Sequence, residues 1–229
     1  MKAAAAIALA ATAACGGGKP ATDAATCAEP PPTRTGEATY YDADGSGNCS
    51  FDPSPGDLMV AAMNAPDYDN AAWCGGCVEV DGPAGTVVVR ITDQCPGCAS
   101  GDLDLSREAF AQIADISAGR VAITWREVPC DVSGPMQYRF KEGSSQYWTA
   151  IQVRNHRYPI AALAVRQSDG SYAAIDRAAY NYFVEADGLG AGPYTLRLTD
   201  DRGHVVEETG IALGDATIAT GAAQFAACE

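Results

Sequence analysis

The chain of 229 residues is long enough for one large domain or for two of about 100 residues each, and we expect two. It contains 24 Gly and 13 Pro but only 8% aromatic residues, a composition typical of turn-rich β structure rather than of long helices. The 29 acidic residues against 15 basic ones give a net charge of −14, which opposes binding to nucleic acid phosphates and to anionic membrane surfaces.

The N-terminus carries an alanine-rich apolar run over residues 3–14, followed by Cys15. This pattern resembles a bacterial lipoprotein signal, in which cleavage leaves the cysteine to carry lipid. It predicts that residues 1–15 are a leader and that the protein is secreted, either free outside the cell or anchored at the cell surface through Cys15. Ordinary secretion and a misassigned start are the alternatives. No other segment approaches the ~20 apolar residues of a membrane span.

A linker rich in Ala, Thr and Pro covers residues 16–35, and the folded part is expected to start near Gly36. The strands expected in its first half cover residues 78–80, 86–92 and 121–126. The first two form a hairpin around the turn at residues 82–85. In the third, one buried face is formed by Val121, Ile123 and Trp125. Ser106 caps a short helix that ends at Gly119 and carries on its buried side Phe110, Ile113 and Ala114.

A break at residues 133–135, Ser-Gly-Pro, marks the expected domain boundary. Beyond it we expect short strands over residues 137–141, 148–154, 160–166, 194–199 and 204–208. Turns at Asp169-Gly170 and Arg202-Gly203 separate some of them. This spacing favours a small antiparallel β-sandwich. The sequence is therefore mostly β in both halves, with one short helix.

Eight cysteines remain when Cys15 is set aside for lipid. They are Cys27, Cys49, Cys74, Cys77, Cys95, Cys98, Cys130 and Cys228. An exported chain with eight cysteines is expected to form disulfides. A zinc site stays open as the alternative, because the two Cys-x-x-Cys pairs at residues 74–77 and 95–98 match the spacing of four-cysteine zinc ligands. His156 and His204 lie far apart in the sequence and indicate neither a metal site nor a catalytic triad, and no cofactor is expected.

Two carboxylates stand at the ends of apolar segments, where an acid can face a groove. Asp93 follows Thr92, and Asp104 lies within Leu103-Asp-Leu-Ser106. Paired carboxylates are the minimum for glycoside hydrolysis, one as acid and one as base or nucleophile. The structural alternatives are a turn aspartate for Asp93 and, for Asp104, favourable interaction with the N-terminus of the helix that follows.

Aromatic residues next to a cation, from Lys141 to Trp148, are typical of sugar binding. In a strand over residues 148–154, Trp148 shares a face with Gln152 and Arg154, so we expect that face to be polar and exposed to solvent. The same parity directs Tyr147 inward, unless the chain bends before the strand. Tyr180 and Tyr182 share a parity, and Tyr180 extends the row of rings. The alternative is that these tyrosines are core or rim residues.

With these residues in hand, the chain resembles a bacterial expansin over residues 36–226. The matching motifs are Gly36-Glu-Ala-Thr-Tyr40, Val78-Glu-Val-Asp-Gly-Pro83, Thr92-Asp93, Leu103-Asp-Leu-Ser106 and nearly all of residues 141–159. The resemblance implies a six-stranded double-psi β-barrel over residues 36–132, followed by an immunoglobulin-like carbohydrate-binding β-sandwich over residues 133–229. It also implies loosening of cellulose-containing walls without hydrolysis.

Carried over by position, the resemblance makes Asp104 the essential acid of the barrel groove, with Thr39 and Asp93 beside it. It makes Trp148, Tyr147 and Tyr180 the aromatic platform for cellulose, with Lys141 nearby. Two positions depart from bacterial relatives. Cys95 stands where they can carry a groove tyrosine, and Tyr147 stands where they can carry a tryptophan, which offers a larger stacking face.

The cysteines instead resemble those of the plant-type barrel. That resemblance implies disulfides between Cys49 and Cys74 and between Cys77 and Cys130. Cys95 with Cys98 and Cys27 with Cys228 are then left as the other two pairs.

The sequence thus predicts a monomeric, non-hydrolytic wall-loosening protein that binds polysaccharide, with cellulose favoured over xylan or peptidoglycan. The first alternative is a glycan-cleaving enzyme, either an endoglucanase or a peptidoglycan lytic transglycosylase. The second is a carbohydrate-binding protein with an inert barrel. We expect no nucleic acid partner and no membrane contact except through a lipid anchor.

Overall fold

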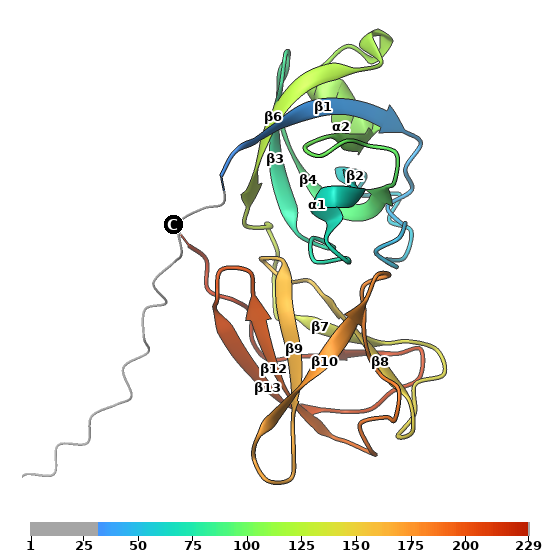
Figure 1. Cartoon of the computed structure of the whole chain (residues 1–229), viewed down its shortest axis with the longest axis vertical. Coiled ribbons are helices and arrows are strands. Elements are labelled where there is room, and N and C mark those ends of the chain that lie inside the picture. Colours follow the sequence, from blue (N-terminus) through green and yellow to red (C-terminus); the bar gives the residue numbers. More distant parts are fainter. Residues whose placement is uncertain (1–31, 229) are drawn as a thin grey trace, which may run out of the picture.

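The computed structural model describes residues 32–228 and consists of two β domains arranged along its longest axis (Figure 1). The first is a closed six-stranded barrel with the strand order β1-β5-β2-β4-β3-β6. Its strands are β1 (Arg34–Tyr41), β2 (Val60–Asn64), β3 (Cys77–Gly82), β4 (Gly85–Cys95), β5 (Leu103–Ser106) and β6 (Val121–Val128). The predicted barrel is therefore confirmed. Its first strand begins at Arg34, two residues before the expected start of the folded part.

The barrel is held by parallel pairs, β1 with β5 and β2 with β4, and by antiparallel pairs between its other neighbours. The predicted hairpin is present as β3 and β4, whose Val80 and Val87 lie opposite each other. The predicted inward face of β6 is also present, because Ile123 and Trp125 are buried in the barrel core. Alternation of apolar and polar residues thus identified these strands correctly.

The helices of the barrel domain are short. They are α1 (Ala65–Tyr68), α2 (Arg107–Ile113) and the 3₁₀ helix η1 (Ile116–Ala118). Ser106 caps α2 as expected, because its hydroxyl accepts a 3.0 Å hydrogen bond from the N–H of Ala109. The prediction of one helix ending at Gly119 was wrong. Ala114 is extended (φ −159°, ψ 161°) and ends α2, while Gly119 closes η1.

The second domain is an antiparallel arrangement of eight strands with the order β13-β12-β9-β10-β11-β8-β7-β14. The strands are β7 (Gln137–Phe140), β8 (Thr149–Arg154), β9 (Ile160–Arg166), β10 (Tyr172–Ala178), β11 (Tyr182–Glu185), β12 (Tyr194–Asp200), β13 (Val205–Ile211) and β14 (Ile218–Thr220). The first half of β10 pairs with β9 and its second half pairs with β11, so β10 passes from one layer to the other. The predicted sandwich is confirmed, although β10, β11 and β14 were not among the predicted strands.

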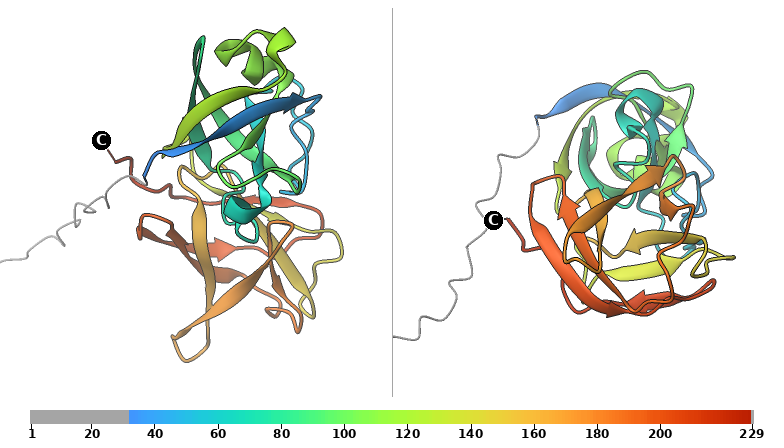
Figure 2. Two further views of the ribbon diagram at one scale, coloured as in Figure 1. Left: turned by 45° about the horizontal axis from the view of Figure 1, so that its top comes forward. Right: turned by 60° about the horizontal axis from the view of Figure 1, so that its bottom comes forward.

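The two domains touch through polar contacts. The turn between β10 and β11 lies against the barrel, where Asn181 donates to the carbonyl of Cys49. Gln152 of β8 donates to the same carbonyl at 2.8 Å. On the other side, Arg202 of the β12–β13 turn pairs with Glu127 of β6. Figure 2 shows the two domains from two further directions. None of the helices within residues 32–228 is long and apolar enough to cross a membrane.

Candidate functional site

A row of four residues crosses neighbouring barrel strands at one level. In the strand register, Thr39 of β1 lies beside Asp104 of β5, Asp104 beside Ala62 of β2, and Ala62 beside Asp93 of β4. The hydroxyl of Thr39 donates a 2.6 Å hydrogen bond to Asp104 Oδ1. The structure thus brings together Thr39, Asp104 and Asp93, the three groove residues singled out in the sequence.

Asp104 faces outward because its neighbours Leu103 and Leu105 are fully buried in the barrel core and side chains alternate along a strand. Partial burial is the main cause that raises the pKa of this carboxyl above its ordinary value, and the charge of Asp93 adds to the effect. The hydrogen bond from Thr39 and the charge of Arg120 act in the opposite direction. The raised pKa favours the protonated form of Asp104, which can donate a hydrogen bond.

Asp93 has a different environment. Its Oδ1 accepts hydrogen bonds from two backbone amides, those of Asn48 at 2.6 Å and Gln94 at 2.8 Å. The register between β2 and β4 shifts at this point, which sets Thr92 and Asp93 at an irregularity of the barrel wall. Asp93 thus holds the Asn48 loop against the groove.

Tyr41 and Thr92 were missed as groove residues. Tyr41 lies two positions after Thr39 and so shares its side of β1, a signal already present in the sequence. The Tyr41 and Thr92 hydroxyls are both buried, and they interact with each other. Burial, together with the charges of Asp93 and Asp104, raises the pKa of Tyr41, and the interaction with Thr92 opposes this rise. A neutral phenol therefore stands beside the two carboxylates.

The aromatic platform, which we define as Tyr147, Trp148 and Tyr180, lies on the second domain. Tyr147 is 75% exposed and Tyr180 is 38% exposed, while Trp148 is half-buried. The parity prediction that Tyr147 points inward was wrong. The chain turns sharply before β8, where the N–H of Ser145 donates a 2.7 Å bond to the carbonyl of Trp148. This is the bend that the sequence left as the other possibility.

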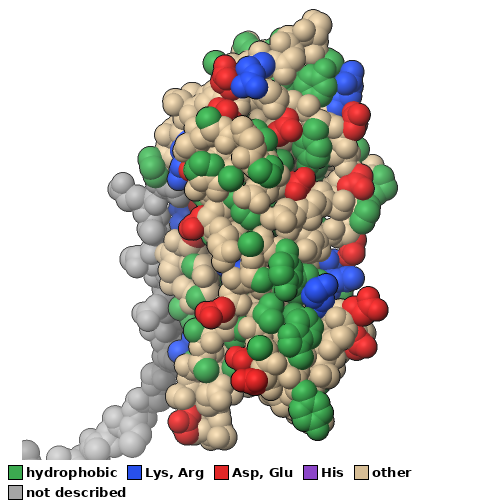
Figure 3. All heavy atoms as spheres, turned by 45° about the vertical axis from the view of Figure 1, so that its right-hand side comes forward, with side chains coloured by type: hydrophobic (Ala, Val, Ile, Leu, Met, Phe, Trp, Pro, Cys, Tyr) green, Lys and Arg blue, Asp and Glu red, His purple; other side chains and the backbone are tan. Residues whose placement is uncertain are grey.

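Lys141 and Tyr182 lie next to the platform. Lys141 Nζ lies 5.6 Å from the ring centre of Tyr182, which in turn contacts Tyr180 at 5.9 Å. Figure 3 shows hydrophobic side chains gathered on one side of the second domain, with charged side chains next to them. The expectation that the Trp148 face of β8 is solvent-exposed was wrong for Gln152, which is fully buried because the barrel covers it.

Three predicted disulfides are present. They join Cys49 to Cys74, Cys77 to Cys130, and Cys95 to Cys98. The zinc alternative was wrong, because the four sulfur atoms it requires belong to these three disulfides. The predicted Cys27–Cys228 bond and lipidation of Cys15 each involve a cysteine outside the described residues.

Comparison with known proteins identifies relatives along most of the chain. A family model described as lytic transglycolase matches residues 33–125. Expansin-YoaJ of Bacillus subtilis strain 168 is 41% identical over 179 residues, which cover 76% of this chain and 76% of that protein. Expansin-like protein 5 of Dictyostelium discoideum is 32% identical over 184 residues, which cover 75% and 76%.

A solved structure of a Clavibacter michiganensis expansin variant in complex with cellohexaose has a TM-score of 0.79 and 35% sequence identity, covering 86% of this chain and all of that one. The structure of the same expansin without ligand has a TM-score of 0.78. The two-domain β fold agrees with these similarities in sequence and structure. The chain belongs to the expansin family.

Proposed function

We propose that this protein binds cellulose and related neutral wall polysaccharides and loosens them without cleaving glycosidic bonds. The observation that carries the proposal is the Thr39–Asp104 pair on the outer face of the barrel, together with exposed aromatic rings on the second domain. The expansin bound to cellohexaose, 35% identical to this chain, supports the choice of a β-glucan as ligand.

In this mechanism the platform holds the glucan by stacking ring faces on the apolar faces of its sugars. Asp104, whose pKa is raised by burial, donates a hydrogen bond from its protonated carboxyl to a glucan oxygen in the groove. This bond competes with the lateral hydrogen bonds between glucan chains, so that the chains slip past one another. No covalent bond is formed or broken.

The environment of Asp93 supports a non-hydrolytic role. Hydrolysis needs a second carboxylate that is free to activate water or attack the sugar. Asp93 is instead engaged by the amides of Asn48 and Gln94 and holds a loop. Asp104 then stands as a single acid, which suits hydrogen bonding to a glucan better than cleavage by two carboxylates.

A matched assay tests this function. Purified protein is incubated with cellulose, xylan and peptidoglycan, and the bound fraction and the released sugar are measured in the same tubes. We expect binding to cellulose with no release of sugar. Asp104→Asn is expected to abolish extension of wall material while cellulose binding stays intact. Loss of both wall extension and cellulose binding in this variant would contradict separate roles for the groove in loosening and the platform in binding.

Peptidoglycan lytic transglycosylation is the second candidate function. The family model that matches the barrel is described as a lytic transglycolase, and such a reaction needs only one acid, a role that Asp104 fits. Its test is the appearance of anhydro-muropeptides from peptidoglycan over time. Their absence, with cellulose bound, favours wall loosening.

We also propose that the protein acts outside the cell, either released or held at the surface through Cys15, and that it acts as a monomer. The net charge of −14 supports a neutral glycan as ligand over anionic wall polymers.

A further inference from the structure

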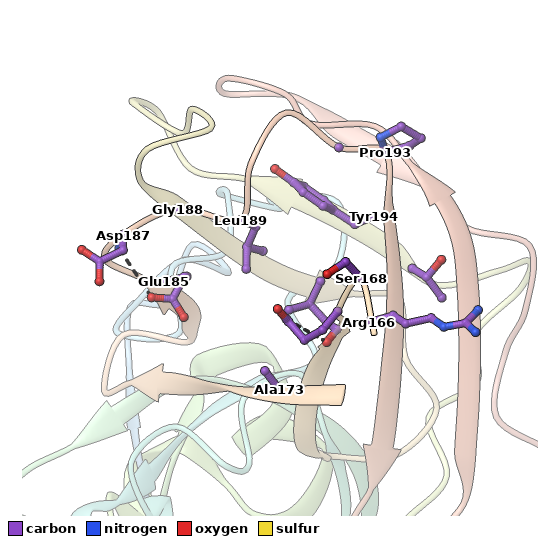
Figure 4. Close-up of a pocket in the computed structure, with 13 residues that line it drawn as sticks. Arg166, Ser168, Ala173, Glu185, Asp187, Gly188, Leu189, Pro193 and Tyr194 are labelled. Carbon is purple, nitrogen blue, oxygen red and sulfur yellow. Dashed lines mark hydrogen bonds between the residues drawn. The ribbon is translucent and has the colours of Figure 1, made fainter. Parts of the chain in front are cut away.

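A large pocket lies in the second domain. It has a volume of about 670 Å³, within the ~300–1,000 Å³ typical of small-ligand sites. Its walls come from the β9–β10 hairpin, the end of β11 and the segment that leads to β12. Figure 4 shows Glu185 and Asp187 on one side, Ser168 on the other, Tyr194 and Leu189 above, and Ala173 below.

One wall of this pocket is shared with the platform. The N–H of Gly190 donates a 3.1 Å hydrogen bond to the carbonyl of Gln146, and the N–H of Leu189 donates a 3.2 Å bond to the hydroxyl of Thr149. Gly188 approaches so closely that a Cβ there would lie 2.1 Å from the Gln146 carbonyl oxygen. The segment that lines the pocket therefore packs directly against the backbone that carries Tyr147.

The lining has the chemistry of a sugar site. Glu185 and Asp187 supply carboxylates, and Ser168 and Thr195 supply hydroxyls. Within the described part of the chain, neither carboxylate forms an ion pair, and Arg166 extends away from both (Figure 4). Carboxylates without a cationic partner accept hydrogen bonds from sugar hydroxyls and repel an anionic ligand.

The apolar part of the lining completes this chemistry. Leu189, Pro193 and the ring of Tyr194 form an apolar wall. Tyr194 is held in place by the hydrogen bond that its hydroxyl donates to the carbonyl of Gly190 at 2.7 Å. Such a wall suits the C–H face of a sugar, while the carboxylates and hydroxyls opposite it suit the hydroxyl groups.

We propose that this pocket binds a neutral sugar residue that branches from a glycan whose backbone lies on the platform. The proposal rests on the proposed function for the position of the backbone, and it adds a preference for branched over plain β-glucan. An acidic branch such as a uronic acid is disfavoured by Glu185 and Asp187.

The proposal is tested by calorimetry on the full-length protein, which measures its affinity for two oligosaccharides. One is a linear β-1,4-linked glucose oligomer, and the other is the same backbone with xylose branches. We expect the branched oligomer to bind about tenfold more tightly, because the hydrogen bonds that its branch adds are only partly offset by the cost of ordering it. Asp187→Asn is expected to reduce this preference severalfold.

A matched pair of variants separates the pocket from the platform. Ala173→Phe places a ring in the pocket, whereas the exposed Ala174→Phe places one on the opposite face of the same strand. Ala173→Phe is expected to remove the preference for the branched oligomer without weakening the linear one, which also shows that the variant is folded. Ala174→Phe is expected to behave as the unaltered protein.

The outcomes distinguish the two proposals. Equal affinity for both oligomers, or a preference that survives Ala173→Phe, overturns the pocket assignment and leaves the proposed function standing. Binding of the branched oligomer alone, lost in Ala173→Phe, supports a sugar site in the pocket but overturns the proposed function and, with it, the position of the backbone on the platform. Binding of neither oligomer contradicts both.

Discussion

The side-chain amide of Asn48 donates a 3.0 Å hydrogen bond across the domain interface to the carbonyl of Ala179. The backbone N–H of the same asparagine donates a 2.6 Å bond to Asp93. Ala179 directly precedes Tyr180, so one residue joins the groove to the aromatic platform. The position of the platform relative to the groove therefore depends on Asn48.

Replacing Asn48 by Ala is expected to reduce wall loosening more than cellulose binding. The change removes the amide that reaches Ala179, at a cost of about 1–2 kcal/mol in the free energy of unfolding. The control is Asn70→Ala, which removes a 2.9 Å bond to the carbonyl of Arg177 in the same hairpin but has no link to Asp93. Wall extension and urea unfolding are measured for both. Equal loss of extension in the two variants would refute a specific role for Asn48.

Replacing Thr39 by Val is expected to move the pH dependence of loosening upward. The hydroxyl of Thr39 lowers the pKa of Asp104, so its removal raises that pKa further. Loosening that needs protonated Asp104 falls as pH rises through this pKa, and in the variant the fall comes at higher pH. Extension is measured across a pH series. Thr92→Val is the control, because the Thr92 hydroxyl has no hydrogen bond with Asp104, and an equal shift in that variant would contradict the explanation.

Replacing Asp104 by Asn is expected to stabilise the fold at neutral pH. Because the folded-state pKa is raised, the native state binds the proton more tightly than the unfolded state does. The stability contributed by this group is present at low pH and is lost as pH rises through the folded-state pKa. Asparagine does not ionise, so the variant escapes that loss. Urea unfolding should show its advantage at pH 7 and none well below 3.8, the ordinary value. An advantage that is independent of pH would mean another cause.

The sequence correctly indicated that Asp104 faces outward, because the signals for that are local. Leu103, Asp104 and Leu105 alternate between core and surface in any strand, and β9 was predicted at its observed bounds for the same reason. Strands β10 and β11 were not predicted. In β10 most residues are small or charged and only Ile175 is buried, so the strand lacks a clear alternation of apolar and polar residues. Their place is set by pairing with distant strands rather than by their own pattern.

The errors at the platform have tertiary causes. The direction of Tyr147 depends on a turn whose hydrogen bond joins Ser145 to Trp148, and parity counting assumes an unbroken strand. Gln152 is polar yet buried because its partner is the Cys49 carbonyl in the other domain, which no pattern within β8 reveals. The alternation of side chains along β1 could have placed Tyr41 beside Thr39, but Tyr41 lies outside the sequence motifs that indicated the groove.

Changing Tyr147 in two directions tests the platform. Tyr147→Ala is expected to weaken cellulose binding by about 1 kcal/mol, roughly fivefold, and Tyr147→Trp is expected to strengthen it because the stacking face grows. Binding isotherms on cellulose measure both. The control is Tyr172→Ala, which removes a ring that packs against Arg197 outside the platform. An equal effect of Tyr172→Ala would mean that cellulose binding does not depend on the platform in particular.

The ion pair between Arg202 and Glu127 is a second contact between the domains. Its contribution to stability can be tested. The guanidinium approaches Glu127 Oε1 at 2.7 and 2.9 Å, and the two side chains are only 6% and 0% exposed. The second oxygen of Glu127 is also buried, and burial together with the interaction with Glu127 raises the pKa of the neighbouring Asp201 to about 8. Removal of Arg202 therefore leaves a buried carboxylate uncompensated, so Arg202→Met is expected to cost about 3–5 kcal/mol in unfolding free energy.

The double variant Glu127→Gln with Arg202→Met removes the charge together with its partner and is expected to recover most of that loss. The exposed pair of Arg120 and Glu37, at 56% and 52% exposure, supplies the comparison. Arg120→Met is expected to cost less than about 1 kcal/mol because solvent screens that pair. Denaturant unfolding of all the variants decides the matter. If Arg202→Met were no worse than Arg120→Met, the buried pair would not stabilise the domain interface.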